Sequence, residues 1–406
     1  MVAAMSMLKT EVAVVGGGPA GLTAAIALAR SGVETALISR RPPQDDHRTT
    51  ALLLGSVTAL ETLGIWQDCV TSAAALRRMR IVDDTNRLLR APEITFDAGE
   101  IGLDAFGYNM QNRHLLAALD KAAESLGATL TRIESGASAI TTNGEGVTVA
   151  LENGDHVSAR LVIGADGRRS LCRTAAGIES DASAYPQTAL TFNLAHTRPH
   201  QDVSTEFHTP QGPFTLVPLP GRYSSLVFVT DPDTAASVAS RDDAELAGEL
   251  ERRAHSILGR FTIQPGRGVF PLAKESARRL GSSRIALIGE AGHVLPPIGA
   301  QGLNLGLRDA ATIAEAVVDA RRGGQDVGAD DLLSRYDGLR RADVGSRTIA
   351  VDMLNRTLLS DFLPFQGARQ LSFFMLKNVG PLRRAVMREG VAPALSQPRL
   401  MRGEAL

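Results

Sequence analysis

The chain has 406 residues and a formal net charge of −1, with 44% hydrophobic and 21% charged residues. This length predicts two or three domains, and the composition is typical of a soluble globular protein. A net charge near zero gives no electrostatic attraction for nucleic acid, so we expect no nucleic-acid partner.

The cysteines and the N-terminus bear on the compartment. Cys69 and Cys172 are the only cysteines, and they form neither a disulfide framework nor a metal-binding pattern, which favours a reducing compartment. The first residues, MVAAMSMLK, lack the charged and apolar regions of a signal peptide. No run of about 18 apolar residues predicts a membrane-spanning helix. We therefore expect a cytoplasmic protein without a metal site.

The first nucleotide-binding signal lies near the start of the chain. A buried strand is predicted at 11–15 and a helix at 22–30, and a second strand at 35–39 completes a βαβ unit. In such a GxGxxG turn, glycines allow the backbone to approach a pyrophosphate, and the helix N-terminus offers N–H donors to it. The turn between strand and helix contains Gly16, Gly18, Pro19, Ala20 and Gly21.

The end of the second strand departs from the usual form of this motif. An acidic residue commonly bonds the ribose of the dinucleotide at this position. Here the residue is Ser39, which can also bond a ribose hydroxyl, and Arg40 and Arg41 follow it. Because two arginines suit a 2′-phosphate, the motif alone leaves FAD and NADP both open.

Between this motif and the next one, the pattern predicts a mixture of helices and strands. The strands at 77–83 and 88–96 are expected to leave the first sheet and to join a second one. The turn at 152–155 makes the strands on either side of it a hairpin. The remaining elements are helices at 51–63 and 113–126 and strands at 129–133, 146–151 and 156–161.

Residues 178–275 have a different pattern, because closely spaced strands predict an antiparallel sheet. A helix is expected at 242–258, and strands at 269–272 and 274–280 lead back toward the first sheet. The strands of the antiparallel sheet are expected at 188–197, 205–208, 214–218 and 223–230.

Two more motifs follow buried strands. The strand at 161–163 ends in Gly164-Ala165-Asp166-Gly167, with Ser170 and Arg173 shortly after it. The strand at 285–288 ends in Gly289-Glu290 and continues through a loop rich in glycine and proline into a helix at 303–320. A strand end with an acid, a flexible loop and a helix N-terminus together suit an anionic ligand.

These three motifs, in this order, resemble the fingerprints of the class A flavoprotein aromatic hydroxylases, the family typified by para-hydroxybenzoate hydroxylase. The resemblance spans about residues 10–320. The segment PPIGAQGLNLGLRDA at 296–310, together with RTTAL at 48–52, is similar to the ubiquinone-biosynthesis hydroxylases within that family. Glu290 stands where the family usually has Asp, which keeps the charge, and Gly292 replaces a usual Ala.

The resemblance implies an α/β fold with a Rossmann-like, GR2-type FAD-binding domain. This domain would comprise residues 1–76, 98–177 and 276–345. An inserted antiparallel β-sheet domain for the substrate would comprise 77–97 and 178–275, and a helical C-terminal region would follow at 346–406.

The resemblance also implies where FAD binds. The turn Gly16–Gly21 would hold the pyrophosphate, and Glu290 would accept a ribityl hydroxyl. The N-terminus of the helix at 303–320 would face the flavin pyrimidine and stabilise the reduced anion, because reduced flavin is negative there. The further cofactor-binding residues would be Ser39, Arg40, Arg48, Asn112 (or Gln111), Asp166, Gly167, Gly302, Leu303 and Asn304. For Asn112, an ordinary helix N-cap is an equally good interpretation.

The implied activity is a monooxygenase reaction in ubiquinone biosynthesis. NAD(P)H would reduce FAD, and dioxygen would react through a flavin C4a-hydroperoxide to hydroxylate the ring of a polyprenylated phenol. Pro296 and Pro297 would fix the backbone beside the flavin. His293 is a candidate general base, although a loop-stabilising histidine is the favoured interpretation. The alternatives are hydroxylation of a small soluble aromatic and a non-catalytic flavoprotein of a biosynthetic complex.

The C-terminal region is rich in Leu and Phe over 355–376 and then contains Arg383, Arg384 and Arg388. A helical layer packed on the cofactor domain is the favoured interpretation. The alternative is an apolar, basic surface at 355–388 that receives a prenyl tail or associates with the inner membrane or a ubiquinone complex. Oligomers are compatible with either interpretation.

Overall fold

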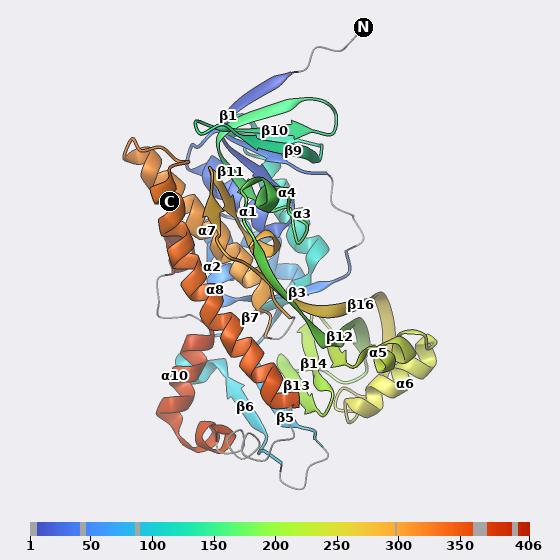
Figure 1. Cartoon of the computed structure of the whole chain (residues 1–406). Helices are drawn as coiled ribbons and strands as arrows, with labels where there is room; N and C mark the ends of the chain where they lie inside the picture. Colours follow the sequence, from blue (N-terminus) through green and yellow to red (C-terminus); the bar gives the residue numbers. More distant parts are fainter. Residues whose placement is uncertain (1–5, 41–45, 86–89, 297–298, 360–371, 392–396) are drawn as a thin grey trace.

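The computed structural model describes residues 6–40, 46–85, 90–296, 299–359, 372–391 and 397–406. Within this part of the chain, two eight-stranded sheets organise the molecule, one above the other in Figure 1. We call them the parallel sheet and the second sheet. A third, three-stranded sheet has the order β3-β7-β4. Its strands are β3 (Thr49–Leu53), β7 (Gly107–Gln111) and β4 (Ala74–Ala75).

The parallel sheet begins from β1 (Met7–Val15), whose last four residues are buried. β1 pairs in parallel with β11 (His156–Gly164) on one side and with β2 (Thr35–Ile38) on the other. Strands buried on both faces read as continuous apolar runs, which is what VAVV and TALI show. β8 (Leu130–Ile133) and β18 (Ile285–Leu287) also pair in parallel, whereas β9 (Ala137–Thr142), β10 (Val147–Leu151) and β17 (Gly281–Ser282) add antiparallel pairs.

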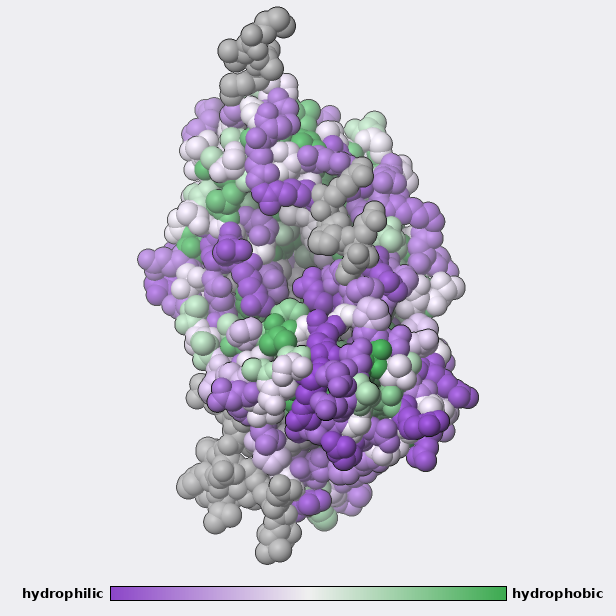
Figure 2. Space-filling model, turned by 90° about the vertical axis from the view of Figure 1, so that its right-hand side faces the viewer, coloured by the Kyte–Doolittle hydropathy of each residue, from purple (hydrophilic) through white to green (hydrophobic). Residues whose placement is uncertain are grey.

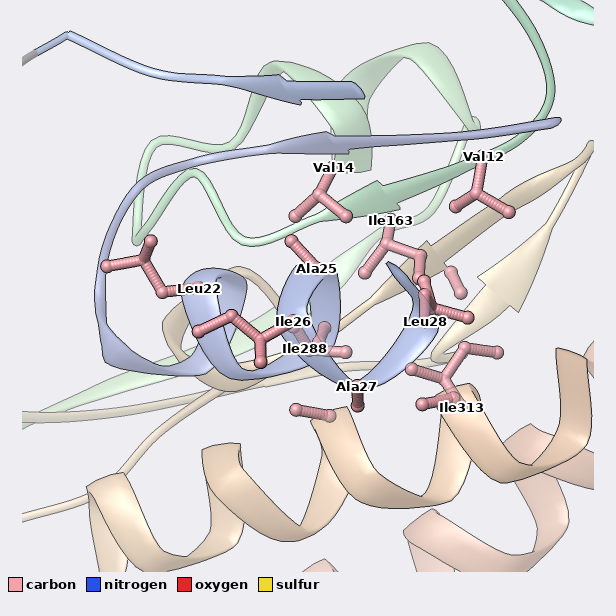
Figure 3. Close-up of a cluster of buried hydrophobic side chains, with 14 of the residues drawn as sticks. Val12, Val14, Leu22, Ala25, Ile26, Ala27, Leu28, Ile163, Ile288 and Ile313 are labelled. Atoms are coloured by element: carbon pink, nitrogen blue, oxygen red, sulfur yellow. The ribbon is translucent and has the colours of Figure 1, made fainter. Parts of the chain in front are cut away.

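Helix α1 (Pro19–Arg30) connects β1 to β2 and fills the core of this half. Figure 3 shows Ala25 next to Val14 of β1, while Ala27 points toward α7 (Gln301–Arg322). Nine consecutive residues of α1 are buried, and most of them are small. Because small side chains let helices approach closely, α1 fits between the sheet and α7. Helix α3 (Asn112–Glu124) also packs against α1.

The second sheet has the strand order β19-β16-β12-β15-β14-β13-β5-β6. All its neighbours are antiparallel except β13 and β5, which run parallel. Alternate residues on one face are buried against helices α5 (Pro232–Ala239) and α6 (Asp243–Arg253). Its strands are β5 (Arg78–Asp83), β6 (Ile94–Asp97), β12 (Ser180–His196), β13 (Val203–Thr209), β14 (Gly212–Leu219), β15 (Tyr223–Thr230), β16 (Phe261–Ala277) and β19 (His293–Val294).

Helix α8 (Asp330–Leu359) runs along one side of the molecule, from the parallel sheet toward the second sheet (Figure 1). Tyr336 anchors it, because its hydroxyl donates to the Leu287 carbonyl at 2.8 Å. Helix α10 (Gly380–Val391) is tied to the edge beside β6 by the ion pair of Arg383 with Glu100 at 2.6 Å. Of the helices in the described residues, none is long and apolar enough to cross a membrane.

The shorter elements connect these layers. Helix α2 (Leu54–Thr62) directly follows β3, and α4 (Leu171–Ala175) follows β11. The 3-10 turns are η1 (Trp66–Asp68), η2 (Val70–Ser72), η3 (Ala98–Ile101), η4 (Gly127–Thr129), η5 (Gly289–Ala291) and η6 (Arg399–Arg402).

Several local predictions are confirmed. The βαβ unit at the start of the chain forms β1, α1 and β2, and the hairpin around 152–155 forms β10 and β11. The strands predicted at 77–83 and 88–96 join the second sheet as β5 and β6. Positions 88 and 89 lie outside the described residues.

Other local predictions are wrong. Residues 51–53 are a strand instead of the start of a helix, because β3 pairs with β7 and the Leu53 N–H bonds Asn304. The helix predicted at 242–258 ends at Arg253, since His255 and Ser256 adopt left-handed backbone conformations. Helix α5 was not predicted, although Asp231 and Pro232 form a standard N-cap and first turn. The two strands predicted over 269–280 are one strand, β16, which ends at Ala277.

Candidate functional site

A cleft of about 700 Å³ lies where the carboxyl ends of β1, β2 and β11 meet. Figure 2 shows this side of the molecule, which is hollowed near the middle of its upper half. Ligands of open α/β sheets bind at such strand ends. The lining residues are Val15, Gly16, Gly17, Gly18, Pro19, Ile38, Ser39, Arg40, Asp46, Arg48, Asn112, Leu116, Gly136, Ala137, Asp166, Arg169 and Leu171.

The glycine-rich turn forms the floor of the cleft, and two of its glycines are sterically required. Gly16 has a φ of +120°, and a Cβ there would lie 2.2 Å from the Ala165 carbonyl oxygen. A Cβ at Gly21 would lie 2.0 Å from the Gly16 carbonyl oxygen. At Gly18, in contrast, an added Cβ would have no described heavy atom within 4 Å. The turn thus holds α1 against the strands and leaves room for a ligand above Gly18.

The N-terminus of α1 is available to an anion. No side chain caps it, and its first turn contains no acidic residue. Unsatisfied N–H groups and the positive end of the helix dipole therefore face the cleft. This combination fits a phosphate group.

Polar side chains of Asp46, Arg48 and Asn112 form one rim of the cleft. Arg48 donates to Asp46 from Nε at 2.9 Å and from Nη2 at 2.7 Å, and Asn112 Nδ2 donates to Asp46 at 3.3 Å. Burial raises the pKa of Asp46, but the bonds from Arg48 outweigh it and lower that pKa overall. The Asn112 Oδ1 atom is buried and has no hydrogen-bond partner within the described part of the chain. An unpaired buried amide oxygen is costly, so a ligand donor would fit it.

Arg40 lies at the outer edge of this rim. Its side chain is exposed and forms an ion pair with Glu152, which lies in the turn between β10 and β11. Ser39 sits beside the glycine-rich turn, because its Oγ is the nearest atom to where a Gly17 Cβ would be. Both residues line the cleft.

Asp166 holds the turn after β11. Its Oδ1 accepts from the Ser170 hydroxyl at 2.6 Å, and its Oδ2 accepts from the Cys172 N–H at 3.1 Å. Ser170 in turn caps α4 by accepting from the Arg173 N–H. Gly167 has a φ of +79°, which side chains rarely adopt. Asp166 is therefore fixed at the wall of the cleft.

The third motif is organised by a buried carboxylate, Asp309 on α7. Its Oδ2 accepts from the Gly289 N–H at 2.9 Å and lies 2.7 Å from His293 Nε2. Its Oδ1 accepts from Arg340 Nε at 2.6 Å. Burial raises the pKa of Asp309, but His293 and Arg340 lower it more, to about 2. The Asp309 carboxylate on α7 thus contacts η5, β19 and α8 at the same time.

This arrangement bears on the role of His293. The side chain is 1% exposed, its Nε2 is engaged by Asp309, and it does not line the cleft. Its Nδ1 is buried, and no residue that the structure describes bonds it. The geometry therefore favours a loop-stabilising histidine over a general base.

Asn304 fixes the start of α7. Its Oδ1 accepts from the Leu53 N–H at 2.8 Å and from the Ser56 hydroxyl at 2.7 Å. Its Nδ2 donates to the carbonyls of Ala51 and Ala300. No side chain caps this helix, and Gly302 faces open space. The N-terminus of α7 is thus rigidly placed while its own N–H groups stay available.

The structure separates the expected site residues into two groups. Gly16, Gly18, Pro19, Ser39, Arg40, Arg48, Asn112 and Asp166 line the cleft. Ala20, Gly21, Gly167, Glu290, His293, Pro296, Gly302, Leu303 and Asn304 lie outside its lining, and Pro297 lies outside the described residues.

The two groups meet at Ala20. A Cβ at Gly306 would lie 3.4 Å from the Ala20 Cβ, and one at Gly289 would lie 3.6 Å from it. The Glu290 side chain is 59% exposed and lies 3.6 Å from Arg168. The α1 turn, η5 and α7 are therefore adjacent, as one extended cofactor would need.

Sequence reasoning missed Asp46, Arg169 and Asp309. Asp46 follows β2 in the sequence and belongs to none of the three motifs, so no pattern predicted it. Asp309 belongs to the LRDA end of the third motif, so its position was visible but its buried role was not. A charged residue within an otherwise apolar helix face was the available signal.

Comparisons with known proteins agree with this geometry. The family described as FAD binding domain matches residues 9–350. The ubiquinone hydroxylase UbiL of Rhodospirillum rubrum is 35% identical over 402 residues, covering 97% of this chain and 92% of that protein. The 3-demethoxyubiquinol 3-hydroxylase of Escherichia coli K12 is 29% identical, covering 95% and 99%.

Solved structures show the same fold. The p-nitrophenol 4-monooxygenase PnpA from Pseudomonas putida DLL-E4 has a TM-score of 0.78 at 20% identity, covering 95% of this chain and 98% of that one. The flavin-dependent monooxygenase PieE, solved with FAD and substrate, has a TM-score of 0.71 at 21% identity, covering 98% and 73%. The fit of the cleft to a dinucleotide and these matches agree on FAD as the cofactor. The chain belongs to the FAD-dependent monooxygenase family that includes the ubiquinone hydroxylases.

Proposed function

We propose that this protein hydroxylates the aromatic ring of a polyprenylated phenol in ubiquinone biosynthesis, using NAD(P)H and dioxygen. The observation that carries the proposal is the cleft above the glycine-rich turn, in a chain that aligns over 97% of its length with a ubiquinone hydroxylase. Bound FAD, once reduced by NAD(P)H, supplies the activation of dioxygen. The protein must bind both molecules, orient the ring and exclude water.

The proposed FAD site uses both groups of residues described above. Gly16–Gly21 and the α1 N-terminus hold the pyrophosphate, and Ser39, Arg40 and Arg48 lie along the adenosine. Asn112 Oδ1 accepts a hydrogen bond from the cofactor, which supplies its missing partner. Asp166 and Gly167 shape the adjoining wall.

The flavin end of the site would lie at the third motif. Glu290 is exposed enough to accept a ribityl hydroxyl. The uncapped N-terminus of α7, at Gly302, Leu303 and Asn304, faces the pyrimidine edge and stabilises its negative charge after reduction. Pro296 and Pro297 fix the adjoining backbone, and His293 braces this loop through Asp309.

We also propose two domains and a helical C-terminus. The FAD domain comprises 1–76, 98–177 and 276–345, and the substrate domain comprises 77–97 and 178–275. The helical C-terminal region comprises 346–406. Separate proteolytic stability of the two sheet regions, followed by mass spectrometry, would test this division.

Peripheral membrane association through the C-terminal region is part of the proposal. Phe374, Met375, Leu382 and Val386 are large apolar side chains with 40–57% exposure. Arg384 and Arg388 are also exposed beside them, whereas Arg383 is engaged by Glu100. Exposed apolar side chains next to cations suit an anionic lipid surface, where a polyprenylated substrate resides.

The decisive experiment supplies purified FAD-loaded protein with NADH or NADPH, a 2-polyprenylphenol and isotopically labelled dioxygen. The expected result is one labelled oxygen atom in the product, with NAD(P)H oxidation that depends on the phenol. Lipid analysis of cells lacking the protein should show accumulation of a less hydroxylated quinone precursor. Hydroxylation of only small soluble aromatics, or flavin that never oxidises NAD(P)H, would contradict the proposal.

A further inference from the structure

The two faces of the second sheet are built differently. On the outer face, under α5 and α6, side chains such as Phe207, Phe214 and Phe228 are at most 2% exposed. The opposite, inner face carries one row of residues across four neighbouring strands, which pair in register. This row is Glu206, Thr215, Val227 and Thr191, and all four are only partly buried.

The inner face is turned toward the cofactor half of the molecule. Asn193, on this face of β12, donates to the His47 carbonyl at 2.9 Å. Ser225, on the same face of β15, accepts from Asn109 of β7 at 3.1 Å. β7 pairs with β3, whose Ala51 carbonyl accepts from Asn304 at the start of α7. The row containing Glu206 thus neighbours the row that contacts the elements holding α7.

An acid and an imidazole are paired at the end of this row. Glu206 Oε1 lies 2.8 Å from His208 Nε2, and Glu206 Oε2 accepts from the Thr215 hydroxyl at 3.3 Å. His208 is 1% exposed, and its ring contacts Phe373 edge to face. Its Nδ1 has no hydrogen-bond partner among the described residues. Burial raises the pKa of Glu206, but the bonds from His208 and Thr215 outweigh it, so the carboxylate stays ionised.

Glu206 links β13 to β14 through Thr215, but packing of the sheet does not require a charged pair at this position. Its row-mate Val227 and its strand partner Ile81 are apolar, and the outer face shows that apolar residues fill this sheet well. A carboxylate taken out of water is costly and is retained where it meets a partner. The Glu206 side chain still keeps 22% of its surface exposed, on the face that turns toward the cofactor half.

We propose that Glu206 binds the hydroxyl group of the aromatic substrate and that His208 is the positioning residue that orients it. Each carboxylate oxygen can accept two hydrogen bonds, and His208 and Thr215 use one on each oxygen. A phenolic O–H can therefore donate to Glu206 while the neighbouring apolar side chains contact the ring. Accepting this hydrogen bond increases electron density in the ring, which hydroxylation of an aromatic requires. This inference rests on the proposed function.

The test compares two ligands that differ only in the hydroxyl group. FAD-loaded protein is titrated with 2-prenylphenol and with prenylbenzene, and binding is followed by the change in flavin absorption. The wild type should prefer the phenol by about tenfold or more, since a hydrogen bond to a charged group is among the stronger ones. Glu206→Gln should reduce this preference to about twofold, with the affinity for prenylbenzene unchanged.

Two further variants separate positioning from general damage. His208→Asn should lower the affinity for the phenol and leave that for prenylbenzene unchanged, whereas a purely structural loss would lower both. Glu245→Gln, on exposed helix α6, is the matched control and should keep the wild-type preference. If Glu206→Gln does not retain FAD, Thr215→Val keeps the charge and should still reduce the preference severalfold.

The outcomes are distinct. An unchanged preference in Glu206→Gln, or a wild type that binds both ligands equally or neither, overturns the role of Glu206. Labelled-oxygen turnover of the wild type tests the proposed function separately. Turnover with an unchanged Glu206→Gln preference would leave the function standing and remove this inference. If the phenol preference depends on Glu206 but no labelled oxygen enters the product, the role of Glu206 would stand and the proposed function would be contradicted.

Discussion

The cleft of the parallel sheet and the inner face of the second sheet use different parts of the chain for recognition. The floor of the cleft is backbone: Gly16, Gly17 and Gly18, and the uncapped N-terminus of α1. The inner face is built from side chains on alternate positions of four strands, Glu206 and Thr215 among them. A cofactor shared by a whole family can be held by backbone, because its phosphates are always the same. A substrate needs side chains that can differ.

The largest expected effect is at the backbone site. Gly16→Ala should abolish FAD binding, because its Cβ would overlap the Ala165 carbonyl oxygen and its φ of +120° suits only glycine. Absorption of the purified protein near the flavin bands measures the loss. Gly345→Ala on α8 is the matched control, since open space surrounds that position, and it should remain fully yellow. A yellow Gly16→Ala protein would show that the cleft does not depend on its backbone as described.

The next effect concerns the charge that joins the third motif to α8. Asp309→Asn should lower the free energy of unfolding by about 3–5 kcal/mol, because it leaves Arg340 buried without its full counter-charge. Urea denaturation of the holoprotein measures this change. Asp233→Asn, an exposed residue on α5, should change the same free energy by less than about 0.5 kcal/mol. Equal stability of the two variants would mean that Asp309 contributes no more than a surface residue.

The same carboxylate predicts a pH dependence. The pKa of Asp309 is about 2 in the folded protein and about 4 in an unfolded chain. A lowered folded pKa gives stability that is fully present above about pH 4 and is lost as the pH falls toward 2. The stability gap between wild type and Asp309→Asn should therefore shrink by about 2–3 kcal/mol over that window. A gap that stays constant between these pH values would contradict the assignment.

The smallest expected effect lies beside the second sheet, at α10. The double variant Leu382→Glu, Val386→Glu should weaken binding to vesicles of phosphatidylcholine and phosphatidylglycerol by about tenfold, since it removes apolar contact and adds repulsion. Vesicle flotation measures binding. Leu339→Glu, an equally exposed position on α8, should bind as the wild type does. Equal loss in both proteins would indicate that α10 is not the contact surface.

The cofactor half could be predicted from the sequence in detail because its signals are local. Strand, glycine turn and helix follow each other between Val12 and Arg30, and the order of elements is what the phosphate site requires. Most strands of the second sheet were predicted for the same reason, since alternation is a property of neighbouring residues, but β16 was predicted as two strands and β19 was not predicted. Among the errors, the one at β3 was decided by a long-range contact, whereas the missed helix α5 carried a local N-cap signal at Asp231. β3 became a strand only because β7 and Asn304 take up its backbone hydrogen bonds.

By itself, the sequence determined the family, the cofactor and the run of elements, because all three depend on residues that are close together in the chain. Only the tertiary structure decided what His293 and Glu206 contact. His293 contacts the carboxylate of Asp309, which lies 16 positions later in the chain. Its place between Glu290 and Pro296 had suggested a catalytic role. Glu206 faces the cofactor half because strand register, set by pairing with β14 and β5, turns it inward. Register and burial are sums over many distant contacts, and no local pattern encodes them.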